Sequence, residues 1–183
     1  MYRLFVAVDL PEQVKNSIRG ICSGLPEARW VDVKQLHLTL RFIGDADDCL
    51  FAAIKESLAE ISESAFSLTL QGVGCFPPKK APRVLWVGIN RNDTLIRLAC
   101  KVEQSLVGIG LQSEQRSFSP HITIARFRDI SPNKAADYLA KNSLFKTESF
   151  PVEEFYLYSS TLTPKGAVHR REATYPLRGG FEF

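Results

Sequence analysis

The sequence predicts one domain of mixed helices and strands in which the second half repeats the first. Amphipathic helical stretches alternate with short β-rich runs in the same order in both halves, and the motif HLTL returns as HITI at the matching position. We expect the halves to span about 1–76 and 83–163, separated by the proline- and glycine-rich loop GCFPPKKAP. With a C-terminal strand at 169–177, residues 1–183 are predicted to form a single bilobal domain.

In the first half, the alternating run at 3–10 predicts a strand. After Pro11, the apolar spacing predicts a helix with one face formed by Val14, Ile18, Ile21, Cys22 and Leu25. The strand that contains HLTL comes next. Asp47 and Asp48 are capping candidates for a second helix, and FSLTLQGV at 66–73 predicts a further strand.

The second half repeats this order. RVLWVGI at 83–89 predicts a strand, and Asp93 is the capping candidate for the helix after it. The strand PHITIARF follows, and Ser131 with Pro132 starts a fourth helix. The strand at 153–162 is predicted to pair with the last strand, REATYPL, through the turn around TPKG.

Composition excludes several classes of protein. The chain has 183 residues, of which 45% are hydrophobic and 23% charged, and its formal net charge is +3. No apolar run approaches the ~18 residues of a membrane-spanning helix, and MYRLFVAVDL predicts a strand rather than a targeting segment. The four cysteines form no CxxC pair. We therefore expect a cytoplasmic protein, monomeric and without a membrane segment.

Two histidines occupy equivalent positions of the repeat. Because side chains alternate along a strand, His37 and Thr39 share one face while leucines fill the other, and His121 and Thr123 do the same. The chain has only three histidines. Two of them at matched positions indicate a functional pair rather than two core residues. With a one-residue slip, Arg41 would correspond to Arg126.

This pairing suits displacement at phosphorus. A duplicated element commonly relates its copies by an approximate two-fold axis, so two histidines can flank one phosphate. In-line displacement needs a base on one side and an acid on the other, and a group with a pKa near ~6.5 can serve as either at neutral pH. Thr39 and Thr123 would donate hydrogen bonds to phosphate oxygens, and Arg126 would add a charged donor.

The paired motifs HLTL and HITI resemble the signature of the two-histidine (2H) phosphoesterase superfamily. LFVAVDLP, FPPKKAPRVLWVGI, PHITIAR and FYLYSSTLTPKG are similar to its RNA 2',3'-cyclic phosphodiesterase branch, formerly called 2'-5' RNA ligase, over nearly the whole chain. The resemblance implies an α+β fold, a bilobal duplication with two mixed or antiparallel sheets lining a central cleft and helices outside. The alternating elements alone favour parallel sheets with crossover helices, and we follow the resemblance.

The resemblance also implies an activity: metal-independent hydrolysis of RNA 2',3'-cyclic phosphate ends to 2'-phosphomonoesters. His37 would be the proton donor to the departing 3' oxygen and His121 the proton acceptor from water. Thr39, Thr123 and Arg126 would bind the phosphate. The two histidine roles are interchangeable in principle, because the reverse reaction swaps them.

Other contacts with a single-stranded RNA end are expected nearby. Phe42, Phe127 and Tyr175 are candidate RNA contacts, although strands of this kind bury most of their aromatic residues and core packing is favoured for each. Basic clusters at 79–83 and 165–171 would attract a polyanion, or form an ordinary solvated surface. His169, in the second cluster, is expected in an exposed turn.

No cofactor is predicted, because the motifs carry neither a metal-ligand set nor a phosphate-cradling glycine loop. The partners expected are RNA ends, with tRNA-derived ends among the candidates. Two alternatives remain: another 2H phosphoester chemistry, such as reversible 2'-5' RNA ligation, cleavage of 2',5'-oligonucleotides or of ADP-ribose cyclic phosphate, and a non-catalytic RNA-binding module. The sequence does not determine the base preference, the direction of reaction or the oligomeric state.

Overall fold

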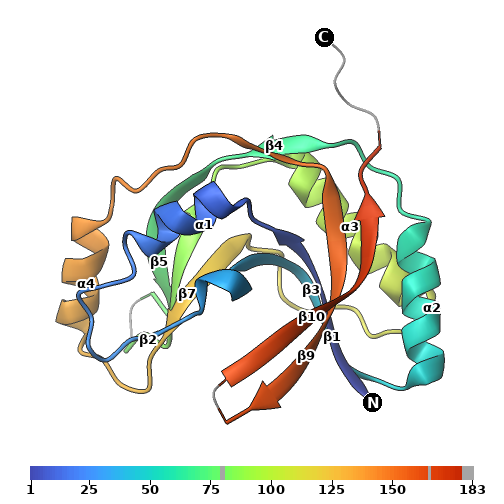
Figure 1. The fold of residues 1–183 in the computed structure, drawn as a ribbon, viewed down its shortest axis with the longest axis horizontal. Helices are drawn as coiled ribbons and strands as arrows, with labels where there is room; N and C mark the ends of the chain where they lie inside the picture. The colour runs from blue at the N-terminus through green and yellow to red at the C-terminus, as the bar shows by residue number, and fades with distance from the viewer. Residues whose placement is uncertain (79–80, 165, 179–183) are drawn as a thin grey trace.

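The structure is a computed structural model that describes residues 1–78, 81–164 and 166–178 (Figure 1). Lys79, Lys80 and Lys165, which belong to the two basic clusters of the sequence, lie outside the described residues. The helices are α1 (Glu12–Arg19), α2 (Asp48–Ala59), α3 (Asp93–Gly108) and α4 (Pro132–Lys141), with one 3-10 turn, η1 (Val33–Gln35). The strands are β1 (Tyr2–Asp9), β2 (Arg29–Trp30), β3 (His37–Ala46), β4 (Phe66–Leu68), β5 (Leu70–Phe76), β6 (Val84–Ile89), β7 (His121–Arg126), β8 (Phe150–Val152), β9 (Glu154–Thr163) and β10 (Gly166–Pro176).

Two four-stranded sheets make up most of the fold. Their strand orders are β10-β9-β1-β3 and β2-β7-β6-β5, and β4 pairs with β8 in a small third sheet. The strand pairs of the described residues are antiparallel. The α+β class with antiparallel sheets is therefore confirmed, and the parallel arrangement that the element order alone favoured is wrong.

The two halves of the sequence exchange strands. The sheet that contains β1 and β3 takes β9 and β10 from the end of the chain, and the sheet that contains β6 and β7 takes β2 and β5 from the first half. Figure 1 shows β9, in orange-red, beside the blue strand β1. Neither sheet therefore corresponds to one half of the repeat, although each contains one copy of the motif strand.

Helix ends follow local capping chemistry. Of the two candidates for α2, Asp47 is the cap and Asp48 already lies inside the helix, while Ser131 caps α4 as predicted; both caps accept from backbone N–H groups through side-chain oxygens. For α3 the cap is Asn92 and not Asp93, because Oδ1 of Asn92 accepts from Leu95 N at 2.8 Å while Asp93 already lies inside the helix.

Several elements differ from the prediction. The C-terminal strand, expected at 169–177, is β10 and begins at Gly166. Helix α1 ends at Arg19, and the apolar residues beyond Gly20 pack against the core from turns instead of a helix. The predicted strand at 66–73 is split at Thr69, because β4 pairs with β8 while β5 pairs with β6. The short elements β2 and η1 were not predicted, since two or three residues carry no periodic signal.

One hydrophobic core joins the sheets to the helices. The apolar residues of both motifs, Leu38, Leu40, Ile122 and Ile124, are at most 6% exposed and point into it. The polar residues of the motifs are thereby held on the opposite face of each strand. None of the helices in the described part of the chain combines the length and the apolar character that crossing a membrane requires.

Candidate active site

The two motif strands place their histidines at equivalent positions in neighbouring sheets. His37 begins β3, His121 begins β7, and β3 contacts β7 although the strands belong to different sheets. Nδ1 of His37 lies 2.6 Å from the Gln35 carbonyl oxygen, and Nδ1 of His121 lies 2.7 Å from that of Ser119. A carbonyl only accepts, so both Nδ1 atoms carry hydrogen, and each neutral ring keeps Nε2 free to accept a proton.

A bulge in β3 determines which side chains join His37. The pairing with β1 shifts between Val6 and Ala7, which leaves Leu40 as an extra residue. A bulge of one residue reverses the alternation beyond it. Phe42 therefore shares the face of Thr39, although the two residues are separated by an odd number of positions.

The same bulge occurs in β7. The pairing with β6 shifts between Leu85 and Trp86, and Ile124 is the extra residue. Arg126 therefore shares the face of Thr123. The structure brings His121, Thr123 and Arg126 together on one face, which simple alternation along the strand would not have done for Arg126.

The register corrects one predicted correspondence. Both bulges fall at the same place in the motif, so the residue equivalent to Arg126 is Phe42, and the predicted slip that matched Arg126 with Arg41 is wrong. Arg41 is mostly buried and belongs to a structural network. Its Nε lies 2.5 Å from Oε2 of Glu103, and its Nη2 donates to the Gln112 carbonyl oxygen at 2.7 Å.

Aromatic rings surround His37. Its ring centroid lies 4.9 Å from that of Phe5 and 6.4 Å from that of Tyr158. Burial lowers the pKa of His37 to about 4, which the hydrogen bond to Gln35 opposes and the charge of His169 reinforces. His37 is therefore neutral at pH 7 when no anion is near it.

His169 does not occupy the exposed turn that was expected. It lies inside β10, opposite Ser160, and is half-buried. Its ring is perpendicular to that of His37, with centroids 5.3 Å apart, and edge-on to Phe5 at 4.9 Å. Sequence reasoning missed this contact because it depends on how far the β9–β10 hairpin extends and on which strand lies beside β9.

Three charged side chains lie next to this group. Asp9 pairs with His37 across β1 and β3, and its carboxylate contacts Lys15 Nζ at 2.8 Å and Arg171 Nη2 at 3.0 Å. The guanidinium of Arg171 also covers the ring of Tyr156 at 3.8 Å. No sequence motif marked this cluster, because its members come from β1, α1 and β10.

His121 has its own aromatic neighbours. Its ring lies edge-on to Phe76 at 5.1 Å and 6.3 Å from the centroid of Trp86. Gly74 makes room for this arrangement, since a Cβ there would overlap the Trp86 ring. A glycine on β5 thus determines how Trp86 packs near His121.

The three candidate RNA contacts lie in different environments. Phe42 is 62% exposed and lies 6.0 Å from Phe5, on the same face as His37. Tyr175 is 7% exposed, stacks on Phe155 and donates its hydroxyl to the Lys55 carbonyl oxygen, and its burial raises its pKa to about 12. Tyr175 and the similarly buried Phe127 are therefore core residues, which is the role that the sequence favoured for both.

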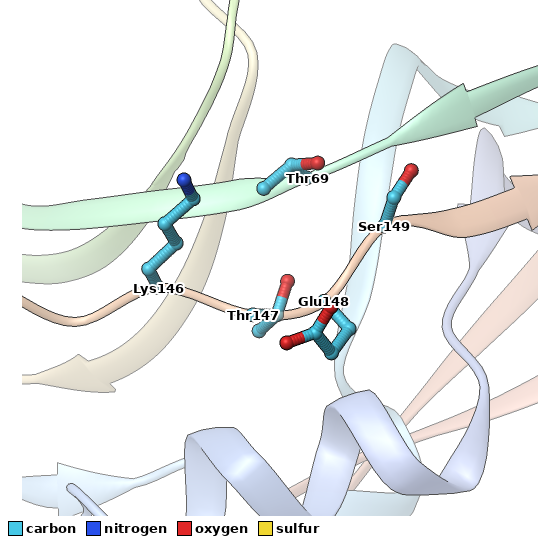
Figure 2. Close-up of a pocket in the computed structure, with 5 residues that line it drawn as sticks. All are labelled: Thr69, Lys146, Thr147, Glu148 and Ser149. Atoms are coloured by element: carbon cyan, nitrogen blue, oxygen red, sulfur yellow. The ribbon is translucent and has the colours of Figure 1, made fainter.

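A separate hollow of about 440 Å³ lies between Thr69 and the segment 146–149 (Figure 2). Thr147, which lines it, accepts a hydrogen bond from Leu70 N at 3.1 Å and holds this segment on β5. None of the motif residues lines this hollow. Among the described residues, no group of three or more histidine, cysteine, aspartate and glutamate side chains converges to hold a metal ion.

The low pKa of His37 predicts a pH-dependent stability. The unfolded chain binds this proton near pH ~6.5, whereas the folded protein binds it only near pH 4. Between these two pH values the unfolded state binds more protons than the folded state, so the free energy of unfolding increases as the pH rises. Acidification from pH ~6.5 to pH 4 should therefore lower the free energy of unfolding by about 3 kcal/mol at most. Urea unfolding across this window should show a weaker pH dependence in His37→Asn; identical slopes would contradict the expectation.

The fold and the two equivalent His-x-Thr strands define a class of phosphoesterases with paired histidines. Residues 4–163 match the family described as the 2'-5' RNA ligase superfamily, and the chain belongs to this superfamily. It is 34% identical to the RNA 2',3'-cyclic phosphodiesterase of Archaeoglobus fulgidus over 171 residues, which cover 92% of this chain and 96% of the relative. It is 35% identical to that of Thermotoga maritima over 174 residues, covering 92% and 91%.

Solved structures agree with this assignment. TT0787 of Thermus thermophilus superposes with a TM-score of 0.79 at 29% identity, covering 97% of this chain and 98% of that one. Apo LigT of E. coli superposes with a TM-score of 0.80 at 26% identity, with the same coverage.

Proposed function

We propose that this protein hydrolyses RNA 2',3'-cyclic phosphate ends to 2'-phosphomonoesters by acid–base catalysis at His37 and His121. One observation carries the proposal. The two histidines begin equivalent strands, and each is held through Nδ1 by the carbonyl two residues earlier, which leaves both Nε2 atoms free for proton transfer. Binding alone would not need a proton-transfer group in each copy of the repeat.

In this mechanism the cyclic phosphate lies between the two motifs. Nε2 of His121 takes a proton from water as the water oxygen attacks phosphorus. The bond from phosphorus to the 3' oxygen breaks, and Nε2 of His37 gives its proton to that oxygen. Thr39, Thr123 and Arg126 donate to the non-bridging oxygens, where negative charge accumulates.

The role of His37 as the acid requires that substrate binding changes its protonation state. His37 is neutral in the free protein because it is buried, whereas its role as acid requires a protonated ring. A bound phosphate anion beside the ring favours the charged form and raises its pKa. His37 therefore takes up its proton when the RNA end binds, and the reverse ligation reaction would start with the two roles exchanged.

The relatives support an RNA end as the substrate. The proteins of Archaeoglobus fulgidus and Thermotoga maritima are named RNA 2',3'-cyclic phosphodiesterases, and LigT of E. coli, 26% identical to this chain, has been crystallised with 3'-AMP. We propose that the chain acts on single-stranded ends, including tRNA-derived ends, as a monomer in the cytoplasm.

Phe42 should provide a stacking surface for a base. Its ring is exposed on the face of His37, and stacking of a base on an aromatic ring contributes about 1–3 kcal/mol. We expect Phe42→Ala to raise KM for a short RNA by about 5- to 150-fold, with kcat nearly unchanged. Steady-state kinetics will measure both, with Leu144→Ala, at an exposed apolar residue just beyond the end of α4, as the control. An unchanged KM would exclude Phe42 as an RNA contact.

The direct test is to identify the product. The protein is incubated, in excess chelator, with a short RNA that ends in a 2',3'-cyclic phosphate. We expect a 2'-phosphomonoester, and RNA with a 3'-phosphate end should stay unchanged. A parallel reaction with added 5'-hydroxyl RNA would detect 2'-5' ligation. An intact cyclic end in both reactions would overturn the proposal and indicate another phosphoester substrate or a binding role.

A further inference from the structure

The third histidine of the chain lies against the first. We propose that His169 is a positioning residue for His37. His169 holds the His37 ring in place, and its closeness makes it unfavourable for both rings to be protonated at the same time. The catalytic meaning of this inference rests on the proposed function, but the contact itself does not.

Packing restricts how the His37 ring can move. The Phe5 ring contacts both His37 and His169, with ring centroids 4.9 Å apart in each case. Phe5 also stacks on Tyr158 at 5.2 Å, with an interplanar angle of 13°. His169 meets His37 at 90°. The hydrogen bond to the Gln35 carbonyl holds Nδ1 of His37, so His169 and Phe5 together determine the direction of its Nε2.

Hydrogen bonding favours a neutral His169. Its Nδ1 is buried and has no hydrogen-bond partner within the part of the chain that the structure describes. A protonated ring would place an N–H there without an acceptor, which is costly for a buried donor. Burial also lowers the pKa of His169.

Charge couples the two rings. Two imidazolium groups whose centroids are 5.3 Å apart repel each other, so the second proton binds with more difficulty than the first. A bound substrate anion favours protonation of one of the two rings. Because His169 remains neutral, the proton binds to His37. A charged residue in its place would oppose protonation of His37 at the time when the ring must be an acid.

The other charged groups around the pair compensate one another in part. From β1 and α1, Asp9 raises and Lys15 lowers the pKa of His37. From β9 and β10 come Tyr158, whose pKa is raised mainly by burial, and Arg171, which is bound to Asp9. Asp9 thus has two cationic partners, and His169 is the titratable ring that lies in direct contact with His37.

The test is a titration of the His37 ring by NMR in the free protein. A chain with three histidines permits assignment by single substitution. His169→Phe keeps the site apolar and removes the charge, so the pKa of His37 should rise by about half a unit to one unit. His169→Gln, which is polar and cannot be charged, should shift it in the same direction. Arg170 follows His169 in a regular part of the β9–β10 ladder and so lies on the opposite face of β10, and Arg170→Gln should leave the pKa of His37 unchanged.

An unchanged His37 titration in both His169 variants would overturn the inference, as would an equal shift in Arg170→Gln. Activity adds a second readout. In the pH profile of kcat/KM for cyclic-phosphate RNA, the limb governed by His37 should move to higher pH in His169→Phe while the other limb stays in place. If the protein does not cleave this RNA, the proposed function fails, and the NMR titration still decides the role of His169.

Discussion

Substitution of either motif histidine should lower kcat for hydrolysis of cyclic-phosphate RNA by about 10²- to 10⁴-fold, the range that general acid or base catalysis contributes. Asparagine is the informative replacement, because its side-chain N–H can still donate to the carbonyl that now holds Nδ1 of His37 or His121. His37→Asn and His121→Asn should fold as the unchanged protein does and retain affinity for inorganic phosphate. Single-turnover kinetics and calorimetric phosphate binding measure the two effects separately.

The double variant makes this test sharper. If the two histidines act in one concerted displacement, the loss in the double variant should be much smaller than the product of the two single losses. Turnover that survives both substitutions would remove the paired-histidine mechanism. Loss of phosphate binding, with the fold intact, would instead indicate that the histidines bind the anion.

Arg126→Gln should lower kcat/KM by about 10²- to 10³-fold, because it removes a donor directed at the charge that develops on phosphate. The register places Arg126 on the face of His121. Arg41 is the matched comparison, since it is also an arginine of a motif strand but its guanidinium is held by Glu103 and the Gln112 carbonyl. Arg41→Gln should reduce the free energy of unfolding by about 1–3 kcal/mol and change kcat/KM little.

Kinetics and urea unfolding of both variants decide between these roles. A large kinetic loss in Arg41→Gln without a loss of stability would contradict the register correspondence and restore the pairing of Arg41 with Arg126. Arg126→Lys separates charge from geometry: partial recovery would show that charge alone contributes, whereas a loss as large as that of Arg126→Gln would show that the planar guanidinium is required.

Sequence and structure agree most closely where the signal is local. The positions of the four helices were predicted, although α1 ends earlier than expected and the cap of α3 is displaced by one residue. The caps Asp47 and Ser131 were among the predicted candidates, because an N-cap needs only its own side chain and the next turn. The hairpin of β9 and β10 was predicted for the same reason. The antiparallel sheets came from the family resemblance, because the order of elements does not specify which strands become neighbours.

The parts of the site that were missed depend on register and on long-range packing. A bulge adds one residue to a strand without a compositional signal, and it gave Phe42 rather than Arg41 the position equivalent to Arg126. His169 and Arg171 reach the surroundings of His37 only because β9 crosses to the sheet of β1. No periodicity within β10 contains that information.

By itself, the sequence determined the repeat, the two histidines with their threonines, and the polar face of each motif strand, because alternation along a strand is a property of the local backbone. Only the tertiary structure decided which strands the two halves exchange, which side chains share a face beyond each bulge, and what environment surrounds His37. These depend on strand pairing between distant segments, where burial of a common core selects one partner among several that are locally equivalent.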